Sequence, residues 1–133
     1  MPQIDSRLVE NSYFVCQTLV SQIRLVKNAL VSWFLIIPDS DKTEWFDFDE
    51  KLQQDLNRQI SQISRFIKEK QAADKINIAM IGNLVPQLHI HVIGRKQDDF
   101  CWPDVIWGRP EFQAYSIEAS QQLIAKFNRE VML

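Results

Sequence analysis

The chain has 133 residues, which is enough for one domain of ordinary size with a single core and too few for two such domains. Hydrophobic residues make up 46% and charged residues 24%, a balance typical of a globular protein and not of a disordered one. The formal net charge of -2 and the lack of a basic stripe argue against binding to long nucleic acid, although a few local donors could still hold one phosphate group. We therefore expect residues 1–133 to form a single domain.

We expect no secretory signal peptide and no membrane-spanning segment. The N-terminal residues include acidic side chains and no long apolar run, unlike a secretory signal peptide. The longest apolar stretch, Trp33 to Pro38, is too short to span a membrane. Cys16 and Cys101 form no close-spaced metal or redox motif, and we interpret each as a buried thiol. The expected protein is cytoplasmic and has no membrane partner.

The first third of the chain predicts strands. Residues 1–11 look like a polar lead-in. Aromatic and β-branched residues cluster at Tyr13–Cys16 and Ile23–Val26, which indicates two strands. The continuous apolar run Trp33–Ile37 ends at Pro38, as expected of a strand that is buried on both faces.

The middle of the chain predicts one long helix, because apolar residues recur every three or four positions. The members of this stripe are Phe48, Leu52, Leu56, Ile60, Ile63 and Ile67. Asp47 and Glu50 resemble a capping box at the start of the helix, which should fade near residues 72–74. We interpret the stripe as core packing.

The last part of the chain returns to strands and closes with a helix. Strands are predicted at Ile76–Ile81 and Leu88–Ile93, separated by turn-forming residues at Gly82 and Asn83. An aromatic loop, Trp102–Gly108, comes next. The closing helix is marked by Tyr115, Ala119, Leu123, Phe127 and Val131. Because no regular βαβ alternation occurs, the predicted fold is α+β, with a mainly antiparallel sheet, one long helix and a C-terminal helix.

Both histidines of the chain lie in the sequence QLHIHV. Because side chains alternate faces along a strand, Gln87, His89 and His91 should share one face. An imidazole pKa of about 6.5 leaves a neutral nucleophile at neutral pH, which could attack phosphorus and form a phosphoramidate that water or another acceptor resolves. A backbone carbonyl could hold one ring nitrogen so that the other presents its lone pair. The neighbouring histidine could stabilise the charged transition state or protonate the leaving group.

The spacing of the histidines leaves other interpretations open. Two histidines on an exposed strand face would be chemically idle. A His-x-His pair also occurs in metal sites, but a metal normally takes three or four protein ligands and the chain has no third histidine. The three glycines form neither a P-loop nor a dinucleotide-binding motif, and there is no Gly-x-Ser-x-Gly elbow. We expect no metal ion and no cofactor.

The segment GNLVPQLHIHVIGR resembles the signature of the histidine triad family, His-φ-His-φ-His-φ-φ, in which φ is apolar. The segment WFLIIP is similar to the buried strand of that family, which ends in proline and precedes a long helix. The segment WPDVIWG is similar to its tryptophan-containing tail. The resemblance extends from residue 13 to residue 108 and implies a homodimer with an α+β fold.

The resemblance also implies an activity and its residues. Members hydrolyse or transfer nucleotidyl groups from dinucleoside polyphosphates, nucleoside phosphoramidates and similar small-molecule substrates, through a covalent nucleotidyl-histidine intermediate. His89 corresponds to the nucleophile, and His91 to a contact with phosphate or the leaving group. Asn83 matches a loop position that often carries a phosphate-contacting amide, and Asn28 lies where an acidic residue often binds the ribose. Arg95 is interpreted either as a phosphate contact or as a solvated strand end.

Two positions depart from the family pattern. Gln87 replaces the first histidine of the triad, and its amide can form hydrogen bonds but cannot titrate. Trp33 stands near the place of a further histidine found in many members. The leading hypothesis is a hydrolase or nucleotidyl transferase, with Gln87 kept in the catalytic set. The alternatives are a catalytically weak nucleotide-binding module and a metal-dependent hydrolase.

Overall fold

The computed structural model describes residues 2–133, in which five strands form one antiparallel sheet in the order β1-β2-β3-β5-β4. The elements in chain order are α1 (Ser6–Glu10), β1 (Ser12–Gln17), β2 (Ser21–Val26), β3 (Ser32–Pro38), a 3-10 helix (Trp45–Asp47), α2 (Glu50–Lys70), β4 (Lys75–Ala79), β5 (Ile90–Arg95) and α3 (Ile117–Glu130). The predicted α+β class, with one long helix and a closing helix, is confirmed.

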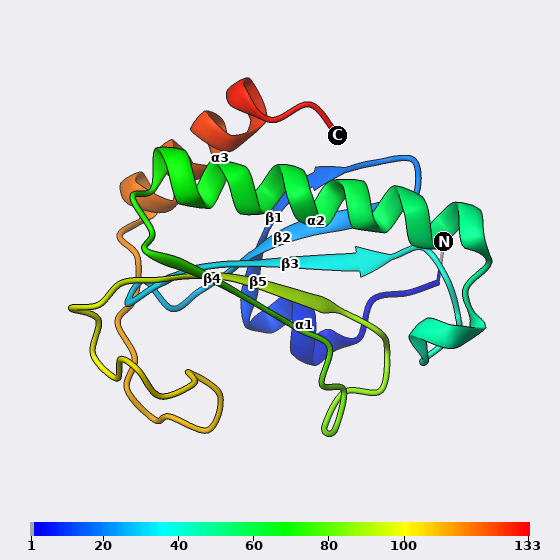
Figure 1. Cartoon of the computed structure of the whole chain (residues 1–133), viewed down its shortest axis with the longest axis horizontal. Helices are drawn as coiled ribbons and strands as arrows, with labels where there is room; N and C mark the ends of the chain where they lie inside the picture. Colours follow the sequence, from blue (N-terminus) through cyan, green and yellow to red (C-terminus); the bar gives the residue numbers. More distant parts are fainter. Residues whose placement is uncertain (1) are drawn as a thin grey trace.

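The two faces of the sheet are covered differently. Helix α2 crosses one face with α3 beside it, whereas α1 and the long connection after β5 lie below the strands in Figure 1. Ile90 and Val92 of β5 point into the core that α2 and α3 cover. Alternation then sends the side chain of His91 to the opposite face. On that face Leu8 of α1 packs against Leu35 and forms a smaller cluster.

Strand β5 lies between β3 and β4, so its residues are held on both sides. His91 is paired with Leu35 of β3 and with Ala79 of β4. Strand β3 is buried from Phe34 to Pro38, as the apolar run predicted. His91 is therefore held by paired strands on both sides, and His89 directly precedes this strand.

Helix α2 begins later than its predicted capping box. The side chain of Asp49, not Asp47, caps the helix by accepting a hydrogen bond of 2.8 Å from the Leu52 backbone N–H. Asp47 instead ends the preceding 3-10 helix. Near the other end of α2, Gly94 allows the helix to approach β5, because a Cβ at this position would overlap Ile67 Cγ2.

The expectation of a polar lead-in at residues 1–11 is wrong for Ser6–Glu10, which form α1. The Asp5 side chain caps this helix by accepting from the Arg7 backbone N–H at 2.9 Å. Leu8 is its one buried residue. A helix of five residues is too short to show a helical apolar period, so the pattern gave no signal.

Neither cysteine forms a disulfide; Cys101 is buried and Cys16 is half-buried. Burial raises the pKa of the Cys16 thiol. Among residues 2–133, no helix is both long enough and apolar enough to cross a membrane.

Candidate active site

His89 and His91 lie together on the face of the sheet that is turned away from α2. His89 directly precedes β5 and His91 is its second residue. Their ring centroids are 4.9 Å apart, with the planes inclined at 64°. His89 is 7% exposed and His91 is 8% exposed, so both rings are surrounded mainly by protein atoms and not by bulk water.

The backbone fixes the orientation of the His89 ring. Its Nδ1 lies 2.7 Å from the carbonyl oxygen of Gln87. A carbonyl oxygen only accepts hydrogen bonds, so Nδ1 donates and carries the proton. The Nε2 atom of a neutral His89 is then left with its lone pair. This is the carbonyl contact expected for a histidine nucleophile.

His91 is enclosed by two tryptophans. The Trp33 indole N–H donates to His91 Nδ1 at 3.0 Å, and the Trp107 ring stands edge-on to the imidazole with centroids 5.5 Å apart. Burial, and secondarily the charge of His89, lowers the pKa of His91 to about 4. His91 is therefore neutral at neutral pH.

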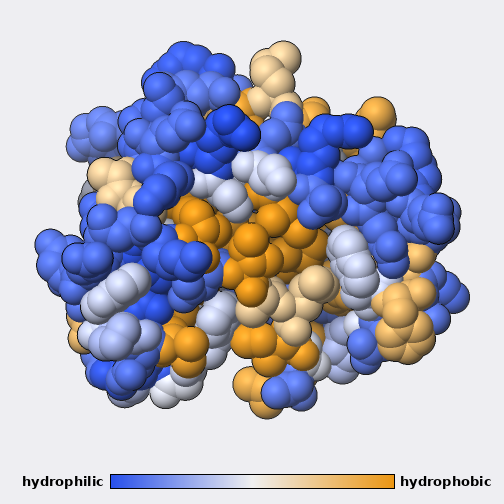
Figure 2. Space-filling model, in the orientation of Figure 1, coloured by the Kyte–Doolittle hydropathy of each residue, from blue (hydrophilic) through white to orange (hydrophobic). Residues whose placement is uncertain are grey.

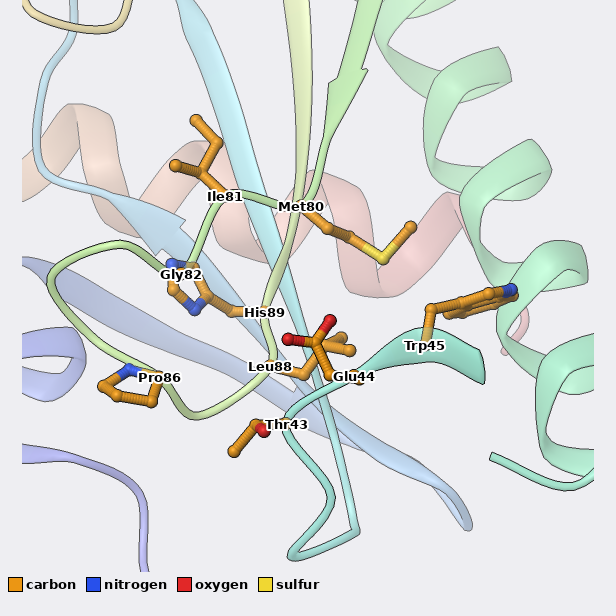
Figure 3. Close-up of a pocket in the computed structure, with 9 residues that line it drawn as sticks. All are labelled: Thr43, Glu44, Trp45, Met80, Ile81, Gly82, Pro86, Leu88 and His89. Atoms are coloured by element: carbon orange, nitrogen blue, oxygen red, sulfur yellow. The ribbon is translucent and has the colours of Figure 1, made fainter. Parts of the chain in front are cut away.

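A cavity of about 320 Å³ opens beside His89. Its walls come from the connection between β3 and α2, the residues that follow β4, and the approach to β5. They are Thr43, Glu44, Trp45, Met80, Ile81, Gly82, Pro86, Leu88 and His89. Figure 3 shows the Glu44 carboxylate turned toward the segment that carries Leu88 and His89, while the Met80 side chain extends toward Trp45. The cavity is thus lined by both polar and apolar groups, as ligand sites commonly are.

Gln87 does not share the environment of the two histidine rings. Its Oε1 accepts a hydrogen bond of 2.7 Å from the backbone N–H of Asp5, and its Nε2 donates to the Gln3 carbonyl at 3.4 Å. Arg7 strengthens the same connection by donating to the Leu84 carbonyl at 2.9 Å. We therefore interpret the Gln87 side chain as an anchor for the N-terminal segment instead of a catalytic group.

The two asparagines have different surroundings. Asn83 is exposed and follows Gly82, which lines the cavity, so its position suits a ligand contact. Asn28 lies between β2 and β3, at the end of β3 away from His89. Its amide donates to the Glu111 carbonyl at 3.2 Å, and its Oδ1 accepts from the backbone N–H groups of Leu30 and Gln113. These contacts tie the segment before α3 to the sheet and occupy the side chain that was expected to bind ribose.

Arg95 is neither a solvated strand end nor a phosphate contact. It is 1% exposed, and its Nε and Nη2 donate to the Asp99 carboxylate at 2.7 and 3.0 Å. A further donor reaches Asn77 Oδ1 at 3.2 Å, and Nη2 also lies 3.5 Å from Cys101 Sγ. The guanidinium holds the pKa of Asp99 at about 2. Arg95 therefore fixes the connection after β5, the segment that brings Trp107 to His91.

The sequence identified Trp33 only as a departure from a family pattern and gave Glu44 and Trp45 no role. One sequence pattern could have predicted the position of Trp33. If the segments WFLII and HIHVI pair as antiparallel strands, Trp33 lies opposite Ile93 and diagonal to His91, on the same face of the sheet. Nothing comparable marks Glu44, because it lies in an irregular connection.

The HIT domain matches residues 8–98, which is more than half of the chain, so the protein belongs to the histidine triad (HIT) family. Three solved histidine triad proteins resemble it closely. The protein from Bradyrhizobium japonicum is 37% identical with a TM-score of 0.93, and 98% of each chain is covered. The protein from Sinorhizobium meliloti is 28% identical with a TM-score of 0.93, covering 97% of this chain and 96% of that one. The protein from Marinobacter aquaeolei is 28% identical with a TM-score of 0.92, covering 97% and 95%. Comparison with curated proteins gives no match.

Proposed function

We propose that this HIT-family protein hydrolyses or transfers a nucleotidyl group at phosphorus, with His89 as the nucleophile. The observation that carries the proposal is the 2.7 Å contact between His89 Nδ1 and the Gln87 carbonyl. That contact leaves the Nε2 lone pair of His89 available for attack, in a residue that borders a cavity of about 320 Å³. The expected substrates are dinucleoside polyphosphates, nucleoside phosphoramidates and similar compounds.

The reaction proceeds in two displacements at phosphorus. In the first, His89 Nε2 forms a bond to phosphorus while the bond to the leaving group breaks, and the leaving group takes the bonding electrons and a proton from the solvent. In the second, water or another acceptor attacks phosphorus and the P–N bond breaks, returning its electrons to His89 Nε2. The attacking group loses one proton, and water as acceptor gives a nucleoside monophosphate.

The neutral state of His91 favours the covalent intermediate. When Nε2 of His89 bonds to phosphorus while Nδ1 keeps its proton, the imidazole ring becomes positively charged. A second imidazolium with its ring centroid 4.9 Å away would repel that charge. Because the pKa of His91 is about 4, the neighbouring ring is uncharged at neutral pH and can contact the phosphoryl group as a neutral hydrogen-bonding partner.

The test is AMP release from an adenosine phosphoramidate and from a diadenosine polyphosphate, followed by chromatography. We expect the wild-type protein to release AMP and His89→Ala to lose this activity while its circular dichroism and AMP binding are retained. His91→Ala is the matched comparison, because it removes the adjacent imidazole but leaves the nucleophile. A folded His89→Ala protein that turns over as fast as wild type would remove His89 from the mechanism.

A weak nucleotide-binding module remains the second candidate. The observation that favours it concerns the Gln87 amide, which takes the place of the first histidine of the triad. This amide forms its hydrogen bonds with Gln3 and Asp5, so it adds no third group to the two histidines that could act on a substrate. AMP binding measured by calorimetry, together with no release from either substrate, would support this function over catalysis.

We also propose that the protein is a homodimer that pairs through β4 and α2. In the part of the chain that the structure describes, β4 is an edge strand. Ile78 of β4 and the following Met80 and Ile81 are exposed, and a groove of about 650 Å³ runs between α2 and β4. Figure 2 shows apolar side chains gathered on this face, below α2. Light scattering should give twice the mass of one chain, and Ile78→Lys should shift it toward the monomer; a monomeric wild-type protein would refute the proposal.

A further inference from the structure

The hydrogen bond between Trp33 and His91 fixes where the imidazole carries its proton. An indole N–H can only donate, so His91 Nδ1, at 3.0 Å, must accept. A neutral imidazole has one proton, which is therefore placed on Nε2. We infer that Trp33 is a positioning residue that holds His91 in the neutral Nε2–H tautomer, so that His91 meets the substrate as a hydrogen-bond donor. The chemical role rests on the function proposed above, whereas the tautomer is a property of the free protein.

The indole is held firmly enough to aim its N–H. Trp33 lies on β3 opposite Ile93, two residues along β5 from His91, and both side chains occupy the same face. Its ring packs against the imidazole with centroids 5.8 Å apart and against Trp107 with centroids 6.4 Å apart. Contacts on two sides, together with two paired strands beneath, fix the direction of the donor.

The two histidines consequently have opposite tautomers. His89 donates from Nδ1 to the Gln87 carbonyl and presents a lone pair at Nε2, whereas His91 accepts at Nδ1 and presents a proton at Nε2. One ring is prepared as a nucleophile and its neighbour as a donor. If the His91 proton moved to Nδ1, Nε2 would become an acceptor and would face the lone pairs of a phosphoryl oxygen without a proton between them. The Trp33 bond opposes that arrangement.

Trp107 provides a matched control for the role of the indole N–H. Its ring also contacts His91, with centroids 5.5 Å apart, but its Nε1 is buried and has no hydrogen-bond partner within residues 2–133. Trp33→Phe and Trp107→Phe each remove one N–H and keep an aromatic ring beside His91. Only Trp33→Phe removes a donor to the imidazole.

The experiment is long-range nitrogen–proton NMR on the ¹⁵N-histidine-labelled protein at neutral pH, which distinguishes a protonated from an unprotonated ring nitrogen. We expect wild type and Trp107→Phe to show His91 protonated at Nε2 alone. Trp33→Phe should show a mixture of tautomers. In the AMP-release assay, kcat of Trp33→Phe should fall by about 2- to 12-fold, the range that one hydrogen bond supplies.

Three results would overturn the inference. A wild-type His91 protonated at Nδ1 would contradict the assigned bond. A single Nε2–H tautomer retained in Trp33→Phe would show that Trp33 does not hold it. A changed tautomer with unchanged kcat would remove the role of His91 as a donor. Because the NMR result requires no turnover, it separates a failure of this inference from a failure of the proposed function, which the His89→Ala assay decides.

Discussion

The connection that follows β5 depends on one buried ion pair. The Asp99 carboxylate accepts from Arg95 Nε at 2.7 Å and Nη2 at 3.0 Å, and from the backbone N–H groups of Lys96 and Cys101 at 3.2 Å each. The two charged side chains are only 2% and 4% exposed. Replacing Asp99 with alanine would leave the guanidinium charge buried without its counter-ion.

The expected cost of Asp99→Ala is large for a single substitution. Removing one partner of a buried pair typically costs about 3–5 kcal/mol. For a domain of this size, each kcal/mol corresponds to a fall in Tm of about 3–4 °C. We therefore expect Tm to fall by roughly 10–20 °C, measured by circular dichroism at neutral pH. The matched control is Asp104→Ala, because Asp104 pairs with Arg109 at side-chain exposures of 72% and 36%, and an exposed pair is worth about 1 kcal/mol or less.

The pH dependence of stability gives a second test of the same pair. The Arg95 guanidinium lowers the pKa of Asp99 from 3.8 to about 2. Because the folded value is below the unfolded one, the stabilisation is fully present above the unfolded pKa and is lost as pH falls through the folded pKa. Between these values the wild type should lose stability more steeply than Asp99→Ala. If Asp99→Ala melted within about 4 °C of wild type, the difference expected for an exposed pair, the argument from burial would be wrong.

Three further predictions follow from other parts of the molecule. Gln87→Ala should speed hydrogen exchange of the Asp5 backbone N–H, because this group donates to the Gln87 side chain, and should lower the free energy of unfolding by about 1 kcal/mol. Unchanged exchange at Asp5, measured by mass spectrometry, would contradict the anchoring role. Gly94→Ala should lower stability in urea by about 1–3 kcal/mol, because the added Cβ would overlap Ile67, and an equally stable variant would show that α2 can move away. Excess chelator should leave AMP release unchanged, because residues 2–133 contain no group of three or more His, Cys, Asp or Glu that could hold a metal ion; loss of activity restored by zinc would revive the metal-dependent reading.

Periodicity predicted most of the sheet and the long helix. The apolar run at Trp33–Ile37 lies in β3, and the stripe from Leu52 to Ile67 lies in α2, although Phe48 precedes that helix. These elements were predictable because burying their apolar faces dominates their energetics. Helix α1 was missed because its stability comes from one cap and one buried leucine. The start of α2 was misplaced because several acidic residues precede it and only backbone geometry selects Asp49.

The pairing of the two histidines was predictable, but the contacts that give them separate roles were not. His89 lies just before β5 and not inside a strand as predicted, because the strand begins at Ile90; the two rings still come together, and a local carbonyl orients the first of them. Gln87 bonds to residues 82 and 84 positions earlier in the chain, a contact that no local pattern encodes. Arg95 looked like a polar strand end because its partner Asp99 belongs to a stretch with the composition of a solvated loop.

The tryptophans around the site make intrinsic fluorescence a suitable signal for binding measurements. The chain has four tryptophans. Trp33 and Trp107 touch the imidazole of His91, and Trp45 lines the cavity beside His89. Three of the four indoles therefore lie where a bound molecule would change their surroundings. Nucleotide titrations can be followed by intrinsic fluorescence on the unlabelled protein, and single Trp→Phe replacements would show which wall of the site a given molecule reaches.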